Sequence, residues 1–597
     1  MNSNTMLPHK IILVILFISI TISRNVAQVI SGEMKTWHKI TLTLEGPETS
    51  EYDTLNPFLD YRMDVTFKNG SNEVIIPGFY AADGQAGETS AKSGNKWKVR
   101  FAPNIPGEWS YQISFRKGKN VSVSGDSSEG EAVSPDGITG RFSVVDTNKK
   151  GRDLRGKGRL LYNSSHYLAY ERNQEPFIKG GANSPENLLG YYQFDQTPDK
   201  HRFEAHSADW KDGDPTWKNG KGKNLIGALN YLSSTGTNSV YFLTMNVMGD
   251  GKDVWPWIDD LERYRFDVSK LDQWEVVFDH MDKLGLVKHI ITQETENECL
   301  LDIGQTGIQR KLYYRELVAR FAHHPGLIWN MGEENGITNW SPIGQTNKLR
   351  LDMIKYMKNL DPYDNPVFIH TLPSQQDHEN TMTGLLGSEL DGVSFQIHHR
   401  QDAHKTIEKW RVKSEQAGKK WVLWIDEIGP AGKGTLPDSN PAQQDSVRKE
   451  VIWSSLLAGG SGVEHYFGYK AAHNDLNCED WRSRDRIWKL TTNATSVFSK
   501  LPVHEMEPAD ELLDSENGHC FAKKGHHYMI YLESGGQAKL DLKDYSGKYK
   551  VMWFDPVKGG SLLKGKVKTL KGGTTASLGL PPYESNQDWV AQITKIK

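Results

Sequence analysis

Residues 312–335 read LYYRELVARFAHHPGLIWNMGEEN and contain one complete helix–turn–strand unit. Apolar side chains recur at helical spacing in its first part, at Leu312, Tyr313, Leu317, Val318 and Phe321. The run His324-Pro325-Gly326 ends this helix, because proline and glycine do not continue a helix. The apolar residues 327–331 then predict a buried strand, which is followed at once by the acidic segment GEEN.

The same alternation of strand and helix runs through the middle of the chain. A helical stripe from Leu271 to Leu284 is stopped by Gly285, and a strand follows directly. Strands are predicted at residues 177–179, 239–243, 287–292, 327–331, 367–370, 392–396, 421–425 and 463–467. Eight strands with helices between them indicate a (β/α)8 TIM barrel. A doubly wound open sheet is the alternative, but no glycine-rich dinucleotide turn follows the first strand.

The segments on either side of the barrel show another pattern, with short alternating strands and turns. Period-two alternation at residues 41–44 and 63–67, with turns such as Pro106-Gly107, predicts an N-terminal β-sandwich. Strands and glycine-rich turns return after residue 506 and predict a smaller sandwich. The fold class is therefore multidomain: a central TIM barrel (165–502) flanked by N-terminal (29–148) and C-terminal (506–597) β-sandwiches. A chain of 597 residues has room for about four average domains, or fewer when one is a large barrel.

The N-terminus has the features of a secretory signal. Lys10 precedes an apolar run at 11–20 that is shorter than the roughly 20 residues of a membrane span. Residues 1–27 are predicted to be removed, which makes the protein exported, periplasmic or secreted, and bacterial. No other segment is apolar enough to be an integral membrane span. Three cysteines exclude a disulfide framework, and a net charge of −4 argues against a nucleic-acid partner.

Carboxylates stand at the ends of two strands that face each other across the predicted barrel. Glu333-Glu334 follow the fourth strand, and Asp426-Glu427 follow the seventh. Reactive groups of TIM barrels lie at the C-terminal ends of the strands. Two carboxyls on opposite sides of a bound sugar are the groups that glycoside hydrolysis needs, one as acid and one as nucleophile or base. Asp426 competes with Glu427 for the second role, because strand alternation turns one of them inward.

The segment Trp329–Asn335 resembles the strand-4 motif of clan A glycoside hydrolases, in which a tryptophan precedes the acid/base glutamate by five positions. The resemblance implies that Glu334 is the acid/base. Residues 320–325 (RFAHHP) are similar to the turn before that strand in apiosidase-like enzymes, and WIDEIG at 424–429 resembles the nucleophile segment, which implies Glu427. Glu333 stands where clan A enzymes usually carry the asparagine that holds the sugar 2-hydroxyl. It is therefore a substrate-binding candidate and a second candidate for the acid.

The flanking segments also resemble known modules. IPGFYAADG at 76–84 and PGEW at 106–109 are similar to an uncharacterised β-sandwich that precedes such barrels in exported bacterial polysaccharide-degrading proteins. WFDP at 553–556 and DWV at 588–590 resemble a C-terminal sandwich of the collagen-binding type. The resemblance to these modules does not imply that this chain binds collagen.

Other polar and aromatic residues near the strand ends are candidate sugar-binding groups. They are Asn246, His398, His399, His465, Trp255 and Trp340. Each histidine has an alternative role as a hydrogen-bonded core residue, and each tryptophan as a packed loop residue. His399 beside Arg400 is also a candidate for holding a sulfate or uronate. The sequence implies no organic cofactor and no metal.

The predicted function is a glycoside hydrolase that cleaves a polysaccharide or oligosaccharide by a two-carboxylate mechanism with net retention. One alternative is a polysaccharide lyase that acts on a uronate-containing glycan, with His398, His399 and Tyr466 as candidate groups. The other is a non-catalytic carbohydrate-binding protein. The sequence predicts neither the sugar and its linkage nor exo or endo action.

Overall fold

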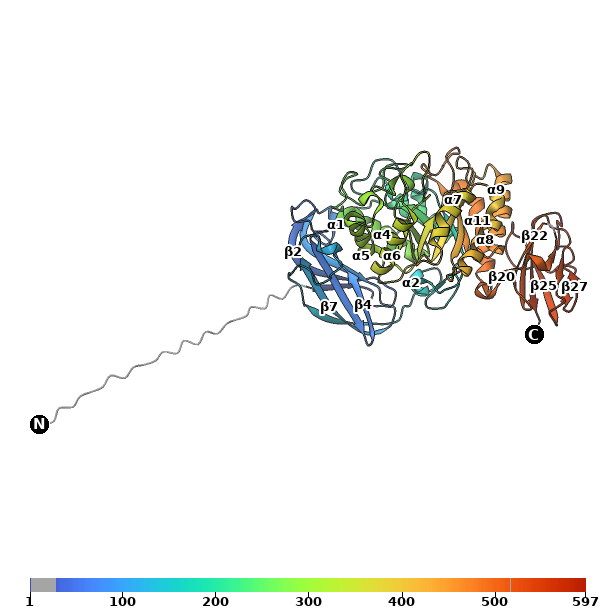
Figure 1. The fold of residues 1–597 in the computed structure, drawn as a ribbon, viewed down its shortest axis with the longest axis horizontal. Helices are drawn as coiled ribbons and strands as arrows, with labels where there is room; N and C mark the ends of the chain where they lie inside the picture. The colour runs from blue at the N-terminus through green and yellow to red at the C-terminus, as the bar shows by residue number, and fades with distance from the viewer. Residues whose placement is uncertain (2–27, 516, 597) are drawn as a thin grey trace.

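The structure, a computed structural model, describes Met1 and residues 28–515 and 517–596. Apart from Met1, the predicted signal segment lies outside the described residues. Three bodies lie in a row along the chain: a β-sandwich, a barrel and a second β-sandwich (Figure 1). The predicted fold class is confirmed, because the middle of the chain forms a closed eight-stranded parallel barrel with β-rich domains at both ends.

The N-terminal domain packs two antiparallel sheets face to face. One sheet has the order β1-β2-β6-β5, and the other has the order β4-β3-β7-β8, with β9 also paired to β7. In β2, Ile40, Leu42 and Leu44 are buried and alternate with partly exposed residues, as expected of a strand with one face in a core. The strands are β1 (Gln28–Gly32), β2 (Ile40–Ser50), β3 (Tyr61–Asn69), β4 (Asn72–Pro77), β5 (Phe79–Tyr80), β6 (Ser93–Phe101), β7 (Gly107–Lys117), β8 (Glu131–Ala132) and β9 (Thr139–Val144). A short helix, α1 (Ala86–Thr89), lies between β5 and β6.

The barrel strands are buried over their whole length. They are β12 (Lys179–Ala182), β13 (Ser239–Leu243), β14 (Val287–Ile291), β15 (Leu327–Asn330), β16 (Val367–His370), β17 (Gly392–Ile397), β18 (Val422–Ile428) and β19 (Gly462–His465). Each strand pairs in parallel with its neighbours in chain order, and β19 closes the ring by pairing with β12. We call the C-terminal ends of these strands, with the loops that follow them, the barrel mouth.

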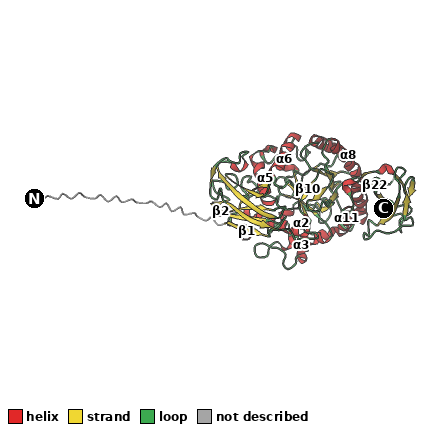
Figure 2. Cartoon of the chain, turned by 90° about the horizontal axis from the view of Figure 1, so that it is seen from below, coloured by secondary structure: helices red, strands yellow, loops and turns green. Residues whose placement is uncertain are grey.

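Helices follow the strands and surround them (Figure 2). They are α3 (Lys223–Ser234), α4 (Val268–Leu284), α5 (Ile308–Phe321), α6 (Asn347–Leu360), α7 (Gln375–Met382), α8 (Ala403–Gln416), α9 (Pro441–Val447), α10 (Ser454–Leu457) and α11 (Asp485–Phe498). A π-helical turn at residues 448–453 joins α9 to α10. The predicted end of α4 is observed, since Gly285 adopts the left-handed conformation (φ +76°) that glycine allows at a helix end.

A small element closes the other end of the barrel. After α2 (Leu154–Lys157), β10 (Leu160–Tyr162) and β11 (Leu168–Tyr170) form an antiparallel hairpin. Leu160 and Leu168 of this hairpin pack in one apolar cluster with Ile328 and Trp424 of the barrel strands. The hairpin therefore closes the N-terminal end, and the barrel mouth is at the opposite end.

The C-terminal domain is a second sandwich, with a six-stranded sheet (β20-β22-β23-β28-β25-β26) facing a three-stranded one (β21-β24-β27). The strands are β20 (Glu507–Pro508), β21 (Leu513–Asp514), β22 (Gly518–Lys523), β23 (His527–Leu532), β24 (Lys539–Asp541), β25 (Lys548–Phe554), β26 (Thr569–Lys571), β27 (Thr575–Ser577) and β28 (Trp589–Lys595). Its six-stranded sheet packs on the barrel helices. Trp453 stacks on Tyr531 with ring centroids 5.6 Å apart, and Arg448 pairs with the buried Asp588 at 2.7 Å.

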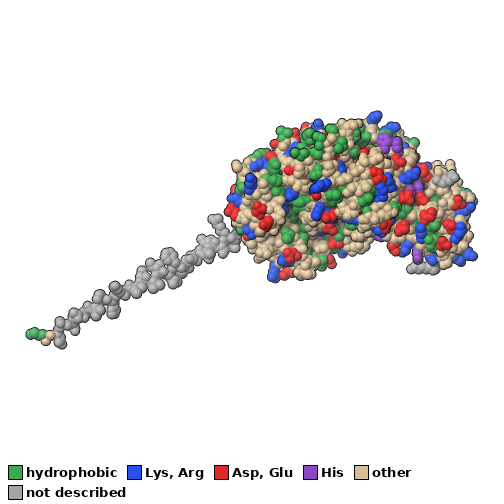
Figure 3. Space-filling model, viewed as in Figure 1, with side chains coloured by type: hydrophobic (Ala, Val, Ile, Leu, Met, Phe, Trp, Pro, Cys, Tyr) green, Lys and Arg blue, Asp and Glu red, His purple; other side chains and the backbone are tan. Residues whose placement is uncertain are grey.

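The face of the molecule drawn in Figure 3 carries both charges. Basic and acidic side chains are scattered over it, with apolar side chains exposed between them. All three cysteines are free thiols, and Cys478 and Cys520 are buried. Among the described residues, no helix combines the length and the apolar character needed to cross a membrane.

Candidate functional site at the barrel mouth

Strand β18 carries two adjacent carboxyls that both point inside the barrel. In a regular strand, neighbouring residues face opposite sides. Here Phe395 pairs with Ile425 and Gln396 pairs with Glu427, so Asp426 is the extra residue of a β-bulge. A bulge redirects side chains and is common beside active sites. It allows Asp426 and Glu427 both to be buried inside the barrel, in different surroundings.

Asp426 belongs to an ionic cluster in the barrel interior. Both of its carboxylate oxygens lie 3.1 Å from Nζ of Lys179. The same ammonium lies 2.6 Å from Glu464 and stands over the ring of Trp424 at 3.9 Å. Burial raises the pKa of Asp426 to about 6, although Lys179 opposes this shift. Asp426 is therefore engaged in the barrel core, below the mouth.

Glu427 lies at the mouth and faces neighbouring strand ends. Its Oε1 accepts a hydrogen bond of 2.5 Å from the side-chain amide of Gln396, and its Oε2 lies 3.9 Å from Nε2 of His370. Burial, followed by the nearby carboxyls of Glu334 and Glu333, raises the pKa of Glu427 well above its ordinary value. The structure thus brings Glu427 together with both glutamates of the strand-4 segment.

Glu333 and Glu334 follow β15 and have different environments. Glu333 is buried, and one of its oxygens lies within 4.8 Å of ligand atoms of both His370 and Glu427. Glu334 is half-buried and adopts φ +42°, a left-handed conformation that a non-glycine residue rarely takes. Such strained residues persist where the surroundings hold them, often at functional sites.

The pKa values of these two glutamates lie near neutrality. Burial raises the pKa of Glu334 to about 7, while contacts with the Gln396 amide and the Thr295 hydroxyl lower it. Burial also raises the pKa of Glu333 to about 8, with a further upward contribution from Glu334. At neutral pH, this group of carboxyls therefore holds protons that ordinary surface glutamates release.

His370, the last residue of β16, links these groups. The backbone N–H of Glu334 donates to Nδ1 of His370 over 3.2 Å, so this nitrogen must accept. The neutral ring then carries its proton on Nε2, which faces Glu427 and has no hydrogen-bond partner in the described part of the chain. Burial holds the pKa of His370 well below its usual range, which keeps the ring neutral.

Three further carboxyls border the same place. Glu186 follows β12, Glu294 follows β14, and Asp475 follows β19. Oxygens of Glu186, Glu294 and Glu333 lie within 4.8 Å of one another. Burial and mutual repulsion raise the pKa of Glu186 well above its ordinary value, and burial raises that of Asp475 to about 7. These carboxyls can share protons, or their oxygens can hold a hard cation such as calcium.

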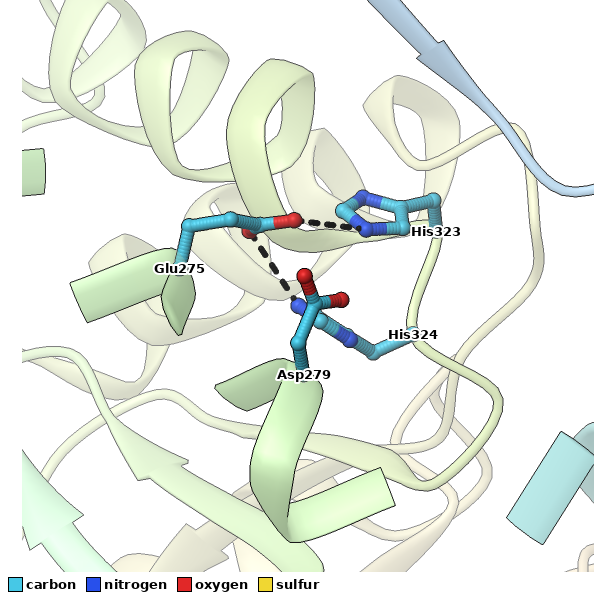
Figure 4. Close-up of side chains that lie close together, drawn as sticks. All are labelled: Glu275, Asp279, His323 and His324. Carbon is cyan, nitrogen blue, oxygen red and sulfur yellow. Dashed lines mark hydrogen bonds and ion pairs between the residues drawn. The ribbon is translucent and has the colours of Figure 1, made fainter. Parts of the chain in front are cut away.

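A second group of possible metal ligands lies far from the mouth, where α4 and the turn after α5 meet the N-terminal sandwich. Figure 4 shows Glu275 between His323 and His324, at 3.1 and 3.3 Å, with Asp279 beside them. The ammonium of Lys39, the residue just before strand β2, already lies 2.7 Å from Glu275 and pairs with Asp279. Lys39 and Arg100, which lies 3.3 Å from Glu275, thus supply positive charge to these carboxylates, and the contacts join the sandwich to the barrel.

The other sequence candidates have several locations. Asn246 is buried and uses its amide within its own loop, where Oδ1 accepts from Asp253 and Val254 at 3.0 and 2.8 Å. Both ring nitrogens of His465 contact threonine hydroxyls, Thr435 at 3.3 Å and Thr491 at 2.7 Å, so it is a satisfied core residue.

The remaining candidates lie around the mouth. His398 and His399 are exposed after β17, and their rings contact each other edge to face at 4.5 Å. Trp340, in the loop after β15, is 60% exposed, whereas Trp255 is half-buried under the Lys270 ammonium. Arg400, the suggested partner of an anionic sugar group, pairs with Glu450 at 3.3 Å.

Several residues at the mouth are not among the sequence candidates. They are Glu186, Tyr241, His370, Gln396 and Asp475. The sequence did not indicate Glu186, because the predicted first strand ends at residue 179. The observed strand β12 ends at Ala182, which brings Glu186 into the loop directly after it. His370 ends a strand that was predicted at its observed bounds, so reading the polar residue at that strand end could have found it.

Comparisons with known proteins agree with this architecture. Residues 33–116 match the family "Domain of unknown function (DUF5060)", and residues 508–593 match the "Putative collagen-binding domain of a collagenase". Both matches support the resemblances of the flanking domains. No curated protein matches the sequence.

Solved structures resemble the chain over most of its length. A "putative glycoside hydrolase from Bacteroides vulgatus ATCC 8482" covers 95% of this chain and 100% of its own at 17% identity, with a TM-score of 0.64. A second structure, named "Glycoside hydrolase", covers 74% of this chain and 97% of its own at 16% identity, with a TM-score of 0.52. At this level of identity the likeness shows a shared fold.

Proposed function

We propose that this protein is a retaining glycoside hydrolase that acts on a polysaccharide or oligosaccharide, with Glu427 as nucleophile and Glu334 as acid/base. The observation that carries the proposal is the location of Glu427. Of the two carboxyls on β18, Asp426 is held by Lys179 in the core, and Glu427 faces the strand-4 glutamates. Carboxyls from strands 4 and 7 at the mouth are the pair that glycoside hydrolysis requires.

In the first step, protonated Glu334 gives its proton to the glycosidic oxygen while the Glu427 carboxylate attacks the anomeric carbon. The bond to the leaving group breaks, and a covalent glycosyl ester forms on Glu427. A pKa of about 7 suits Glu334 for this task, because it keeps the proton at neutral pH and still transfers it readily. The Gln396 amide, which donates to Glu427, lowers the pKa of this carboxyl and so favours its ionised form.

In the second step, ionised Glu334 takes a proton from water, and the water oxygen attacks the anomeric carbon. The ester bond to Glu427 breaks, and the sugar is released with its original configuration. Both glutamates then return to their starting protonation states. No step requires an organic cofactor.

Glu333 is the second candidate for the acid, and its distance from Glu427 suits that role. Its oxygen lies within 4.8 Å of an oxygen of Glu427, close to the spacing of about 5–5.5 Å in retaining enzymes and well below the roughly 6.5–9.5 Å of inverting ones. The sequence position favours Glu334, and the higher pKa and full burial of Glu333 suit a residue that binds a hydroxyl. Substitution of each residue separately decides between them, as described in the Discussion.

A glycan panel with purified protein tests the proposed function. The expected result is new reducing ends from at least one glycan, and proton NMR early in the reaction should show the product with the anomeric configuration of the substrate. Inversion of configuration would contradict a nucleophilic Glu427.

The same panel addresses the two alternatives. A lyase would release unsaturated products that absorb in the ultraviolet, and its exposed candidates His398 and His399 lie outside the carboxyl group at the mouth. A binding protein would retain glycan without forming any product.

A further inference from the structure

The buried titratable groups at the centre of the barrel mouth are mostly carboxyls. The carboxyls of the mouth come from the ends of five different strands, and they are Glu186, Glu294, Glu333, Glu334, Glu427 and Asp475. Within the described residues, none of them forms an ion pair with lysine or arginine. The only ionisable base near them in the described residues is His370, whose Nε2 lies 3.9 Å from Glu427, and this ring is neutral.

No lysine or arginine of the described residues pairs with these six carboxyls. Lys252, Lys433 and Lys470 are exposed in the loops after β13, β18 and β19, and none of them lies within 4.0 Å of these carboxyls. Lys179 lies below the mouth between Asp426 and Glu464. Arg400, after β17, pairs with Glu450. An anionic sugar group would therefore enter a place where each carboxyl that is ionised repels it and where, among the described residues, no cation contacts the carboxyls to neutralise it.

Buried polar atoms that lack partners among the described residues point to a ligand with hydroxyl groups at this place. Nε2 of His370 carries a proton and is unpartnered, as are Oε1 of Gln396 and the hydroxyl of Tyr241, all in residues no more than 2% exposed. His370 Nε2 faces Glu427, and Glu333 is the carboxyl that raises the pKa of Tyr241 most. One neutral donor, one acceptor and one hydroxyl beside several carboxyls can pair with sugar hydroxyls, each of which both donates and accepts.

We infer that the sugar bound in the reacting subsite carries no carboxylate or sulfate, so the substrate is a glycan whose cleaved residue is uncharged or basic. This inference rests on the proposed function and narrows it. It also replaces the suggestion, made from His399 and Arg400, that the site holds a sulfate or uronate.

Matched substrates test the inference. For each aryl glycoside or glycan that the protein cleaves, kcat/KM is compared with that of its uronic-acid counterpart (C6 oxidised to carboxylate) and of its sulfated counterpart, in both anomeric series. The expected result is a value at least about 100-fold lower for each anionic partner. Equal or faster cleavage of the anionic partner would overturn the inference.

A variant that removes one charge provides an independent measurement. Asp475→Asn should reduce the ratio of kcat/KM for a neutral substrate to kcat/KM for its anionic counterpart. Glu408→Gln, at an exposed position on α8, should leave this ratio unchanged. An unchanged ratio in Asp475→Asn would count against the electrostatic explanation.

Each assay is repeated with EDTA and with calcium. Cleavage of an anionic glycan only with calcium would overturn the inference and assign a cation to the Glu186–Glu294–Glu333 group.

The outcomes separate this inference from the proposed function. Cleavage of anionic glycans alone, abolished by Glu427→Gln, would leave the hydrolase proposal standing and remove the inference. Absence of cleavage across all neutral and anionic glycans would remove both.

Discussion

The backbone N–H of Glu334 donates a 3.2 Å hydrogen bond to Nδ1 of His370, and this contact fixes two features of the site at once. It holds Glu334 in its left-handed conformation at the end of strand 4, and it places the imidazole proton on Nε2, toward Glu427. A single side chain on strand 5 thereby positions the proposed acid and faces the proposed nucleophile.

The first prediction concerns the roles of the three glutamates. Glu427→Gln and Glu334→Gln should each lower kcat by about 10²–10⁴-fold or more, because each removes a group that acts on the reacting bond. Glu333→Gln should raise KM more than it lowers kcat if this residue holds a hydroxyl. Circular dichroism and melting curves check that each variant is folded, and Glu408→Gln is the matched control.

Azide distinguishes which glutamate is the acid. Small anions enter the space that a shortened side chain leaves, so azide should restore turnover of an activated aryl glycoside by Glu334→Ala and give a glycosyl azide of retained configuration. Glu427→Ala should give the inverted azide, because attack comes from the opposite face. Rescue with retention in Glu333→Ala instead of Glu334→Ala would transfer the acid role to Glu333.

The second prediction concerns His370 as a positioning residue. His370→Phe keeps a ring but loses the acceptor for the Glu334 N–H and the proton that faces Glu427, so kcat should fall by about 10-fold or more. The acidic limb of the kcat/KM profile should also move to higher pH, since Glu427 loses the imidazole N–H that faces it at 3.9 Å and whose dipole favours its ionised form. A reduced rate with an unmoved pH profile would indicate a purely structural role, and exposed His526→Ala is the control.

The third prediction is the pH dependence of activity. Glu334 must be protonated in the first step, so kcat/KM should fall as the pH rises through about 7, the pKa of this residue. The carboxyls are coupled, and the limb reports the group rather than one residue. With an activated substrate that needs no acid, Glu334→Gln should keep measurable activity and lose this basic limb; persistence of the limb would place the titrating acid elsewhere.

The fourth prediction is that the mouth destabilises the protein at high pH. Glu333 and Asp475 have pKa values of about 8 and 7 in the folded chain, above their ordinary values, so the folded state binds more protons than the unfolded state. The free energy of unfolding should therefore fall between about pH 4 and pH 8, by about 1.4 kcal/mol for each unit of raised pKa. Melting temperatures from pH 5 to pH 9 measure this decline.

A variant tests the origin of that decline. Glu333→Gln cannot ionise, so its melting temperature should depend less on pH and exceed that of the unaltered protein at pH 8.5. Equal slopes for the two proteins would show that the loss of stability arises outside the mouth.

The sequence was sufficient for the barrel because its signals are local and repeated. Eight apolar runs separated by amphipathic helices specify the strands, and Gly285 marks a helix end that the structure reproduces. The choice between Asp426 and Glu427 could not be predicted from such local patterns. It depends on a bulge against Gln396 and on Lys179, a residue distant in sequence.

Other parts of the site were also set by contacts between distant segments. His465 stands at a strand end like a sugar-binding residue, yet it is satisfied by Thr435 and Thr491. Glu186 and Asp475 lie in the loops after the first and last strands and come together because the barrel closes β19 onto β12. A pattern along one strand does not contain this information.

The packing of the C-terminal sandwich has a consequence for how the protein can be divided. Trp453 and Phe498 on the barrel, with Phe521, Tyr531 and Phe554 on the sandwich, belong to one continuous apolar core, and Arg448 reaches across to the buried Asp588. A barrel truncated before residue 506 would expose two aromatic rings to water and leave Arg448 without its partner Asp588, paired only with Asp445. The C-terminal sandwich and the barrel therefore form one packed unit, and the sandwich is not an independent domain joined by a flexible linker.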